Sequence, residues 1–294
     1  MGYLVFVSLL WAFSFGLIKG QLAGVDPGYV AAIRLSLCFI TFLPLVFWFK
    51  SNRSPIKLMA LGALQFGVMY IAYIQSYQYL PGYLVAVFTI FTPIYVFALN
   101  AFLEKRFDYR HALIVALSIL GAAIMVAQSV EGNDFIIGFM LLQVANLAFG
   151  CGQVLYVRYC KLHRTDKNGQ QSSDGINLMW MYFGAALLAS IYTISFGDFQ
   201  RMHLKTEQLW VVLYLGVISS ALGFYCWNKG ATQVSNTTLA VMNNAYMPFA
   251  VIFAFTLFGE DVDFARLLAG GSCIVMSIVL SVYLTNRQIN QPGS

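Results

Sequence analysis

The chain has 294 residues, of which 60% are hydrophobic and only 10% are charged, whereas an average soluble domain has roughly 45–50% apolar and about 25% charged residues. Its net charge of +5 is too small to indicate nucleic-acid binding, and its few polar side chains cannot cover a soluble fold of this size. A soluble enzyme, a nucleic-acid-binding module and a disordered chain are therefore disfavoured, and the bilayer remains as the expected surroundings.

Long hydrophobic runs follow one another along the whole chain. A membrane-spanning helix needs about 20 apolar residues, and these runs are too long and too little alternating for the strands of a β-barrel. The pattern predicts an all-α membrane protein with ten transmembrane helices, at approximately 3–18, 29–49, 58–79, 83–103, 112–129, 136–157, 176–196, 209–228, 237–258 and 265–285.

The first two predicted spans carry one aromatic and one charged candidate for binding a solute. Trp11, with Ser14 nearby, is the weaker candidate, because a tryptophan in a span usually packs or anchors at the interface. Arg34 lies several residues inside its span, where an arginine costs about 2.5–3.5 kcal/mol on insertion scales. Arg34 should therefore face protein, where it either ties helix ends together or binds a carboxylate.

The third and fourth spans carry hydroxyl groups. Tyr70 and Tyr73 lie on one face of a helix and too near its middle for interfacial anchors. They are interpreted either as packing or as the wall of a cavity. Thr89 and Thr92 directly precede Pro93, which interrupts backbone hydrogen bonding in mid-membrane.

The sixth span presents a polar face. Gln143, Asn146, Gly150 and Gln153 recur at helical spacing and so share one side of the helix. Because amides are costly in lipid, this face should look into the bundle. Asn146 and Gln153 either join helices by hydrogen bonds or bind the cargo.

The eighth and ninth spans supply the remaining candidates. Trp227 is a weaker one, for the same reason as Trp11. Asn243 and Asn244 stand just before Tyr246 and Pro248, at a point where the helix should be distorted near the midplane. Adjacent asparagines beside a helix break are the strongest predicted part of the site, and Thr89 to Thr92 should face them.

Acidic residues are missing from the middle of every predicted span. All twelve acidic residues and all three histidines lie in loops or at span ends, whereas proton relays and intramembrane metal sites place such groups inside spans. We therefore expect no catalytic residue, no cofactor and no metal. The expected cargo is a small neutral or monoanionic metabolite, and a homodimer is left open.

The distribution of Lys and Arg predicts that both termini are cytoplasmic. With the N-terminus inside, four such residues fall in outside loops and eleven fall inside, namely Lys50, Arg53, Lys57, Lys105, Arg106, Arg110, Arg158, Lys161, Arg164, Lys167 and Arg287.

The chain also repeats itself. Pro93 and Pro248 lie at matching places, 155 residues apart, and five helices per copy make two tandem copies opposite in orientation. The expected organisation is a first five-helix repeat at 1–129, an inverted second repeat at 136–285 and a cytoplasmic tail at 286–294. This plan is that of secondary transporters.

The stretch WAFSFGLIKG, the arginine in AAIRLSL and the two proline-bearing spans resemble the EamA branch of the drug/metabolite transporter superfamily. The resemblance covers essentially the whole chain and implies ten helices in two inverted repeats. The stretches LLWAFSF, GALQFGVMY, FTIFTPIY, LLQVANLAFG, WNKGATQV and TLAVMNN are similar to the biotin permeases of enterobacteria within this family.

The resemblance implies a permease that moves a small metabolite across the bacterial inner membrane by alternating access, with biotin uptake as the favoured activity. Two alternatives stay open. One is an exporter of amino acids or related carboxylate or amine metabolites, and the other is a membrane binding or scaffold protein that transports nothing. Fold alone does not select the cargo.

Overall fold

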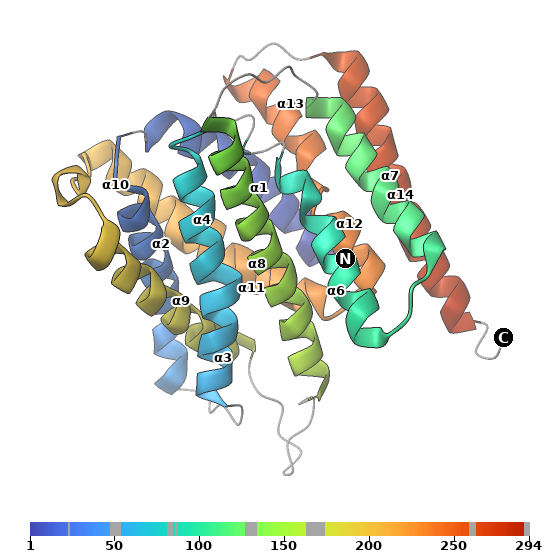
Figure 1. Cartoon of the computed structure of the whole chain (residues 1–294), viewed down its shortest axis with the longest axis horizontal. Coiled ribbons are helices and arrows are strands. Elements are labelled where there is room, and N and C mark those ends of the chain that lie inside the picture. Colours follow the sequence, from blue (N-terminus) through green and yellow to red (C-terminus); the bar gives the residue numbers. More distant parts are fainter. Residues whose placement is uncertain are drawn as a thin grey trace.

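The computed structural model describes residues 1–22, 24–47, 54–80, 85, 88–126, 134–162, 174–258 and 263–290. These residues are helical almost throughout, with no strand among them, and the helices form one bundle (Figure 1). The predicted all-α class is confirmed. Most of the start of the fourth predicted span (83–88) and the last residues of the predicted tail (291–294) lie outside the described residues.

The first half of the chain contains helices that correspond to the first five predicted spans. They are α1 (Gly2–Gln21), α2 (Pro27–Phe42) with its 3₁₀ continuation η1 (Leu43–Phe47), α3 (Pro55–Gly62), the π-helical η2 (Ala63–Val68), α4 (Met69–Ser76), the 3₁₀ turn η3 (Thr89–Phe91), α6 (Thr92–Glu104) and α7 (Tyr109–Val126).

The second half corresponds to the other five spans. It contains α8 (Asp134–Leu162), α9 (Asp174–Phe196), the 3₁₀ turn η4 (Phe199–Arg201), α10 (Thr206–Leu213), the π-helical η5 (Tyr214–Leu222), α11 (Gly223–Ala231), α12 (Asn236–Met242), α13 (Tyr246–Phe258) and α14 (Phe264–Asn290). The last helix extends to Asn290, five residues beyond the predicted end of its span.

Six helical stretches are long and apolar enough to cross a membrane. They are Pro27–Phe47, Pro55–Ser76, Phe135–Leu162, Asp174–Phe196, Thr206–Ala231 and Phe264–Arg287, and shorter apolar helices cover Gly2–Ser14, Thr89–Glu104 and Tyr109–Ile124. The multi-pass membrane architecture predicted from composition is therefore confirmed.

Both proline-bearing spans are interrupted, as predicted. In the ninth span, α12 ends at Met242, a turn follows at residues 243–245, and α13 begins at Tyr246, two residues before Pro248. In the fourth span, η3 precedes α6, whose first turn contains Pro93. Proline has no N–H to donate and its ring clashes with the preceding turn, so each proline lies in the first turn of a new helix and disfavours a regular continuation from the helix before it.

Two further spans carry π-helical stretches. In the third span η2 separates α3 from α4, and in the eighth span η5 separates α10 from α11. A shift by the 155 residues that separate the two prolines brings residues 63–67 of η2 onto residues 218–222, the last five residues of η5. Such stretches are often found at functional sites, because they leave backbone groups and side chains out of the regular helical register.

Glycines allow α3 and α9 to cross at very short range. A Cβ atom added to Gly62 would lie 1.9 Å from the carbonyl oxygen of Met181, and one added to Gly184 would lie 2.2 Å from that of Met59. Small residues at a helix crossing are how membrane helices gain close van der Waals packing.

One end of the bundle gathers several helix termini. Asn236 Nδ2 at the start of α12 donates to Glu104 Oε1 at the end of α6, at 2.6 Å, and Arg158 Nη1 near the end of α8 donates to the Leu103 carbonyl oxygen at 3.5 Å. We call this the Glu104 end. Helices α7 and α14 run side by side along one flank of the bundle (Figure 1).

Candidate functional site

A central cavity of about 110 Å³ lies among the helices near the breaks and the π-helical stretches. On this measure one water needs roughly 10–15 Å³, so the space suits a small organic molecule. Its lining comes from both halves of the chain and consists of Trp11, Ser14, Arg34, Met69, Tyr70, Tyr73, Thr89, Thr92, Ala145, Asn146, Phe149, Ser219, Phe224, Asn243 and Tyr246.

Arg34 provides the cation of this cavity. Its side chain is only 2% exposed, and its Nη2 donates to Tyr70 Oη at 2.9 Å and to Ser220 Oγ at 3.0 Å. Its guanidinium carbon also lies 4.6 Å from the centre of the Tyr70 ring. The Nε and Nη1 atoms are buried without a hydrogen-bond partner. Buried donors of this kind are costly when unpaired, so Arg34 is held in place with two donor positions left for an acceptor.

Asn146 on α8 brings an amide to another part of the lining. Its Nδ2 donates to the Phe88 carbonyl oxygen at 2.6 Å, and its Oδ1 accepts from Thr92 Oγ1 at 3.1 Å. Thr92 Oγ1 also hydrogen-bonds to the Thr89 carbonyl oxygen at 2.9 Å. The break before Pro93 therefore fixes the amide through one backbone oxygen, that of Phe88, and through the Thr92 hydroxyl.

Three side chains form a polar layer between the cavity and the Glu104 end, which we call the amide floor. Trp227 Nε1 donates to Gln153 Oε1 at 3.0 Å, and Gln153 Nε2 donates to Asn243 Oδ1 at 3.3 Å. Asn243 Nδ2 is anchored on the Leu239 carbonyl oxygen at 2.9 Å. All three side chains are at least 94% buried, so these bonds replace hydration that the site cannot provide.

Aromatic rings form the apolar wall. Trp11 packs edge to face on Phe224, with ring centres 5.2 Å apart, and stacks on Trp227 at 4.9 Å. Its Nε1 donates to the Ser219 carbonyl oxygen at 3.1 Å. Phe149 lies 6.0 Å from both Trp11 and Phe224. The rings are thus locked by one another and by the carbonyl oxygen that η5 exposes.

Hydroxyl pairs close the cavity on the side away from the Glu104 end. Tyr73 Oη and Tyr77 Oη are 2.8 Å apart, and Thr89 Oγ1 hydrogen-bonds to Tyr246 Oη. The second pair joins η3 of the first half to α13 of the second. Both helix breaks therefore contribute to the same closure.

The structure brings most of the predicted site residues together. Nine of the predicted residues line the cavity, namely Trp11, Arg34, Tyr70, Tyr73, Thr89, Thr92, Asn146, Asn243 and Tyr246. Gln153 and Trp227 lie behind this lining in the amide floor. Asn244 is turned away, and its Nδ2 donates to Ser118 Oγ on α7 at 3.2 Å.

Sequence reasoning missed five lining residues, which are Met69, Ala145, Phe149, Ser219 and Phe224. For two of them the sequence contains a feature that could have predicted their place in the lining. Phe149 stands three residues after Asn146 and so shares its helix face, and Ser219 belongs to a serine pair in the middle of an apolar span.

Comparisons with known proteins agree with this architecture. The sequence pattern of the EamA-like transporter family matches residues 1–127 and 169–283. A probable biotin transporter from Pseudomonas aeruginosa is 38% identical over 95% of this chain and 96% of its own length. Biotin transporters from Salmonella typhimurium and Escherichia coli are each 32% identical over 95% of this chain and 91% of theirs. A solved crystal structure with 14% identity superposes with a TM-score of 0.79, covering 96% of this chain and 97% of that one.

Proposed function

The chain belongs to the EamA-like transporter family, and from this premise we propose that it takes up biotin across the bacterial inner membrane by alternating access. It is a multi-pass membrane transporter with the ten-helix fold of that family. The chemistry of its central cavity supports biotin as the cargo, and we assign it no catalytic activity.

The observation that carries the proposal is a buried arginine with open donors in a cavity that also holds amides and aromatic rings. Arg34 Nε and Nη1, which have no partner, suit the oxygen of a carboxylate, because hydrogen bonds between a guanidinium and an anion are strong. Asn146 and Asn243 suit a ureido ring, which both donates and accepts hydrogen bonds. The rings of Trp11 and Phe224 suit the apolar body between these two ends. Biotin combines all three features.

The lining also weighs against the first alternative, an exporter of amino acids or amines. Among the described residues that line the cavity there is one cation and no carboxylate, so an ammonium group would lack an anionic partner and would face Arg34. A solute with a carboxylate and no charged amine fits this set of charges better.

We further propose that residues 1–129 and 136–285 form two inverted repeats and that both termini are cytoplasmic. Three features support this arrangement. The two helix breaks meet at one closure, the two π-helical stretches overlap under the same shift as the prolines, and the loops beside Glu104 and Asn236 lie at one end.

Cysteines introduced as Ser172→Cys and Asn133→Cys, each in a background without the five native cysteines, test this topology. We expect a membrane-impermeant maleimide to label position 133 from the outside of intact cells and position 172 only after permeabilisation. Labelling of both positions from the same side would contradict the span count and the inverted repeat together.

The transport proposal is tested by counterflow into liposomes that contain the purified protein and unlabelled biotin. We expect labelled biotin to accumulate inside. We also expect Asn243→Ala to weaken biotin binding about five- to hundredfold, because losing a hydrogen bond from a buried neutral group costs roughly 1–3 kcal/mol and about 1.4 kcal/mol is a tenfold change in affinity.

Asn244→Ala is the matched control for this experiment. Its amide faces Ser118 and η3 instead of the cavity, so its loss should lower thermal stability and leave biotin affinity unchanged. Equal loss of affinity in both variants would mean that biotin does not bind at Asn243. A folded protein without counterflow would favour a binding or scaffold protein. Counterflow of an amino acid with none of biotin would favour the exporter.

A further inference from the structure

A second and larger cavity, of about 760 Å³, opens at the Glu104 end between the start of α7 and the end of α14. We call it the arginine cavity, because Arg106, Arg110 and Arg287 line it together with the apolar side chains of Phe97, Phe107 and Leu284. It lies apart from the central cavity and shares no lining residue with it.

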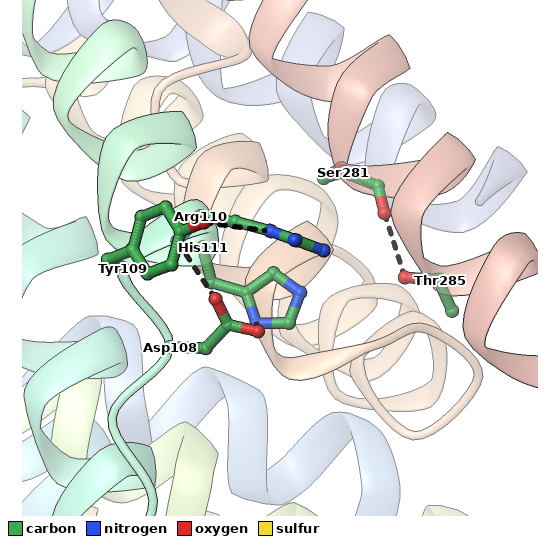
Figure 2. Close-up of polar contacts among 6 residues, drawn as sticks. All are labelled: Asp108, Tyr109, Arg110, His111, Ser281 and Thr285. Carbon is green, nitrogen blue, oxygen red and sulfur yellow. Dashed lines mark hydrogen bonds and ion pairs between the residues drawn. The ribbon is translucent and has the colours of Figure 1, made fainter. Parts of the chain in front are cut away.

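The turn between α6 and α7 brings two of these arginines to the cavity. Lys105 adopts a left-handed conformation, with φ of 52°, and the Arg106 N–H donates to the Ala101 carbonyl oxygen at 3.2 Å. This C-cap reverses the chain, so that residues 106–111 return along the helix ends. Figure 2 shows Arg110 and His111 reaching from the start of α7 toward the side of α14 that carries Ser281 and Thr285.

The carboxylates of the cavity are already engaged, whereas none of its three arginines forms an ion pair with a carboxylate among the described residues. Glu104 accepts from Asn236 at 2.6 Å, and Asp108 accepts from the Arg110 N–H at 2.9 Å and faces His111 at 3.7 Å. The Arg110 side chain donates only to Tyr109 Oη, at 3.3 Å, among the described residues. The guanidinium groups of Arg106 and Arg287 have no hydrogen bond or ion pair with any residue that the structure describes.

The surroundings of the cavity point to lipid. Phe107 is 73% exposed and Tyr109 62% exposed, and Leu113, one turn further along the same face of α7, is 65% exposed. An anion dissolved in water would gain nothing from these apolar neighbours. An amphiphile whose headgroup meets the arginines could lay its chains against them, because basic pockets between membrane helices bind anionic headgroups.

We propose that the arginine cavity binds the phosphate of an anionic phospholipid such as phosphatidylglycerol. A general excess of positive charge at one side of the membrane explains why basic residues lie at this end. It does not explain why three arginines from α7, its preceding turn and α14 converge on one partly apolar cavity. The site is independent of the cargo, and its test involves no transport measurement.

Native mass spectrometry of the full chain tests this proposal, with equimolar phosphatidylglycerol and phosphatidylcholine of matched acyl chains. We expect the protein to retain phosphatidylglycerol selectively. Each arginine near an anionic headgroup changes affinity roughly fivefold, so the double variant Arg110→Gln/Arg287→Gln should bind phosphatidylglycerol about thirtyfold more weakly and lose the preference.

The matched control is Arg158→Gln/Lys161→Gln, which removes the same charge at the same end but from a neighbouring cavity. This variant should keep the preference, and an equal loss would reduce the effect to general surface charge and overturn the proposal. Retention of both lipids alike by the native chain would also overturn it. Displacement of phosphatidylglycerol by millimolar inorganic phosphate would overturn the assignment to lipid.

The single variant Arg106→Gln tests the same site in case the double variant does not fold. Its side chain is exposed and without a partner among the described residues, so its removal breaks no contact there. A several-fold weaker binding of phosphatidylglycerol at unchanged melting temperature would support the site, and unchanged binding would count against it.

Discussion

Arg34→Ala is expected to abolish the advantage that a carboxylate cargo has over its uncharged analogues. Truncating one partner of a buried, hydrogen-bonded charge pair costs about 2–5 kcal/mol, so biotin binding should fall roughly thirtyfold or more. Biotin amide and biotin methyl ester, which lack the anion, should lose much less. Isothermal titration of the purified variants with the three ligands measures the difference.

The comparison of acid with amide is made within one protein, so a modest loss of stability in the variant does not disturb it. Tyr70→Phe is the companion variant, because it removes a hydrogen bond that holds Arg34 and keeps the ring beneath the guanidinium. Its effect on biotin should be intermediate. An equal loss of affinity for acid, amide and ester in Arg34→Ala would make Arg34 a framework residue.

Gly62→Ala is expected to be the most destabilising single-methyl change in the described part of the chain. The added Cβ would lie 1.9 Å from a backbone oxygen of α9, and no rotation of a side chain can relieve a clash between backbones. Overpacking in a close-packed interior typically costs 1–3 kcal/mol and sometimes more, and separating α3 from α9 should reach about 3 kcal/mol or beyond. Thermal unfolding followed by size-exclusion chromatography measures the loss.

Gly184→Ala approaches the same crossing from the other helix, with 2.2 Å to Met59, and should behave alike. Gly271→Ala is the matched control in a membrane helix, because its nearest neighbour for an added Cβ is 4.0 Å away on Pro248. Similar melting temperatures for Gly62→Ala and Gly271→Ala would show that α3 and α9 can move apart to accept the added methyl group at little cost in stability.

Much of the fold could be predicted because it depends on local chemistry. The break before Pro248 follows from the missing N–H of proline, and the inward position of Arg34 follows from the cost of a charge in lipid. The same reasoning placed Asn146 inside the bundle. Each of these inferences needs only the residue and its depth in a span.

The remaining features depend on contacts between distant parts of the chain. Asn243 and Asn244 are neighbours, yet one lines the cavity and the other binds Ser118, because the turn at 243–245 rotates successive side chains to different sides. Gln153 is satisfied by Trp227, which stands 74 residues further along the chain. No local pattern reveals that two polar residues will pair with each other instead of with a ligand.

The amide floor also bears on the proton gradient across the membrane. Gln153, Trp227 and Asn243 join through amide and indole groups, none of which gains or loses a proton at physiological pH. These three side chains therefore offer no titratable group that could carry a proton across the layer that they form. While the amide floor is intact, we therefore expect no proton leak through these three residues.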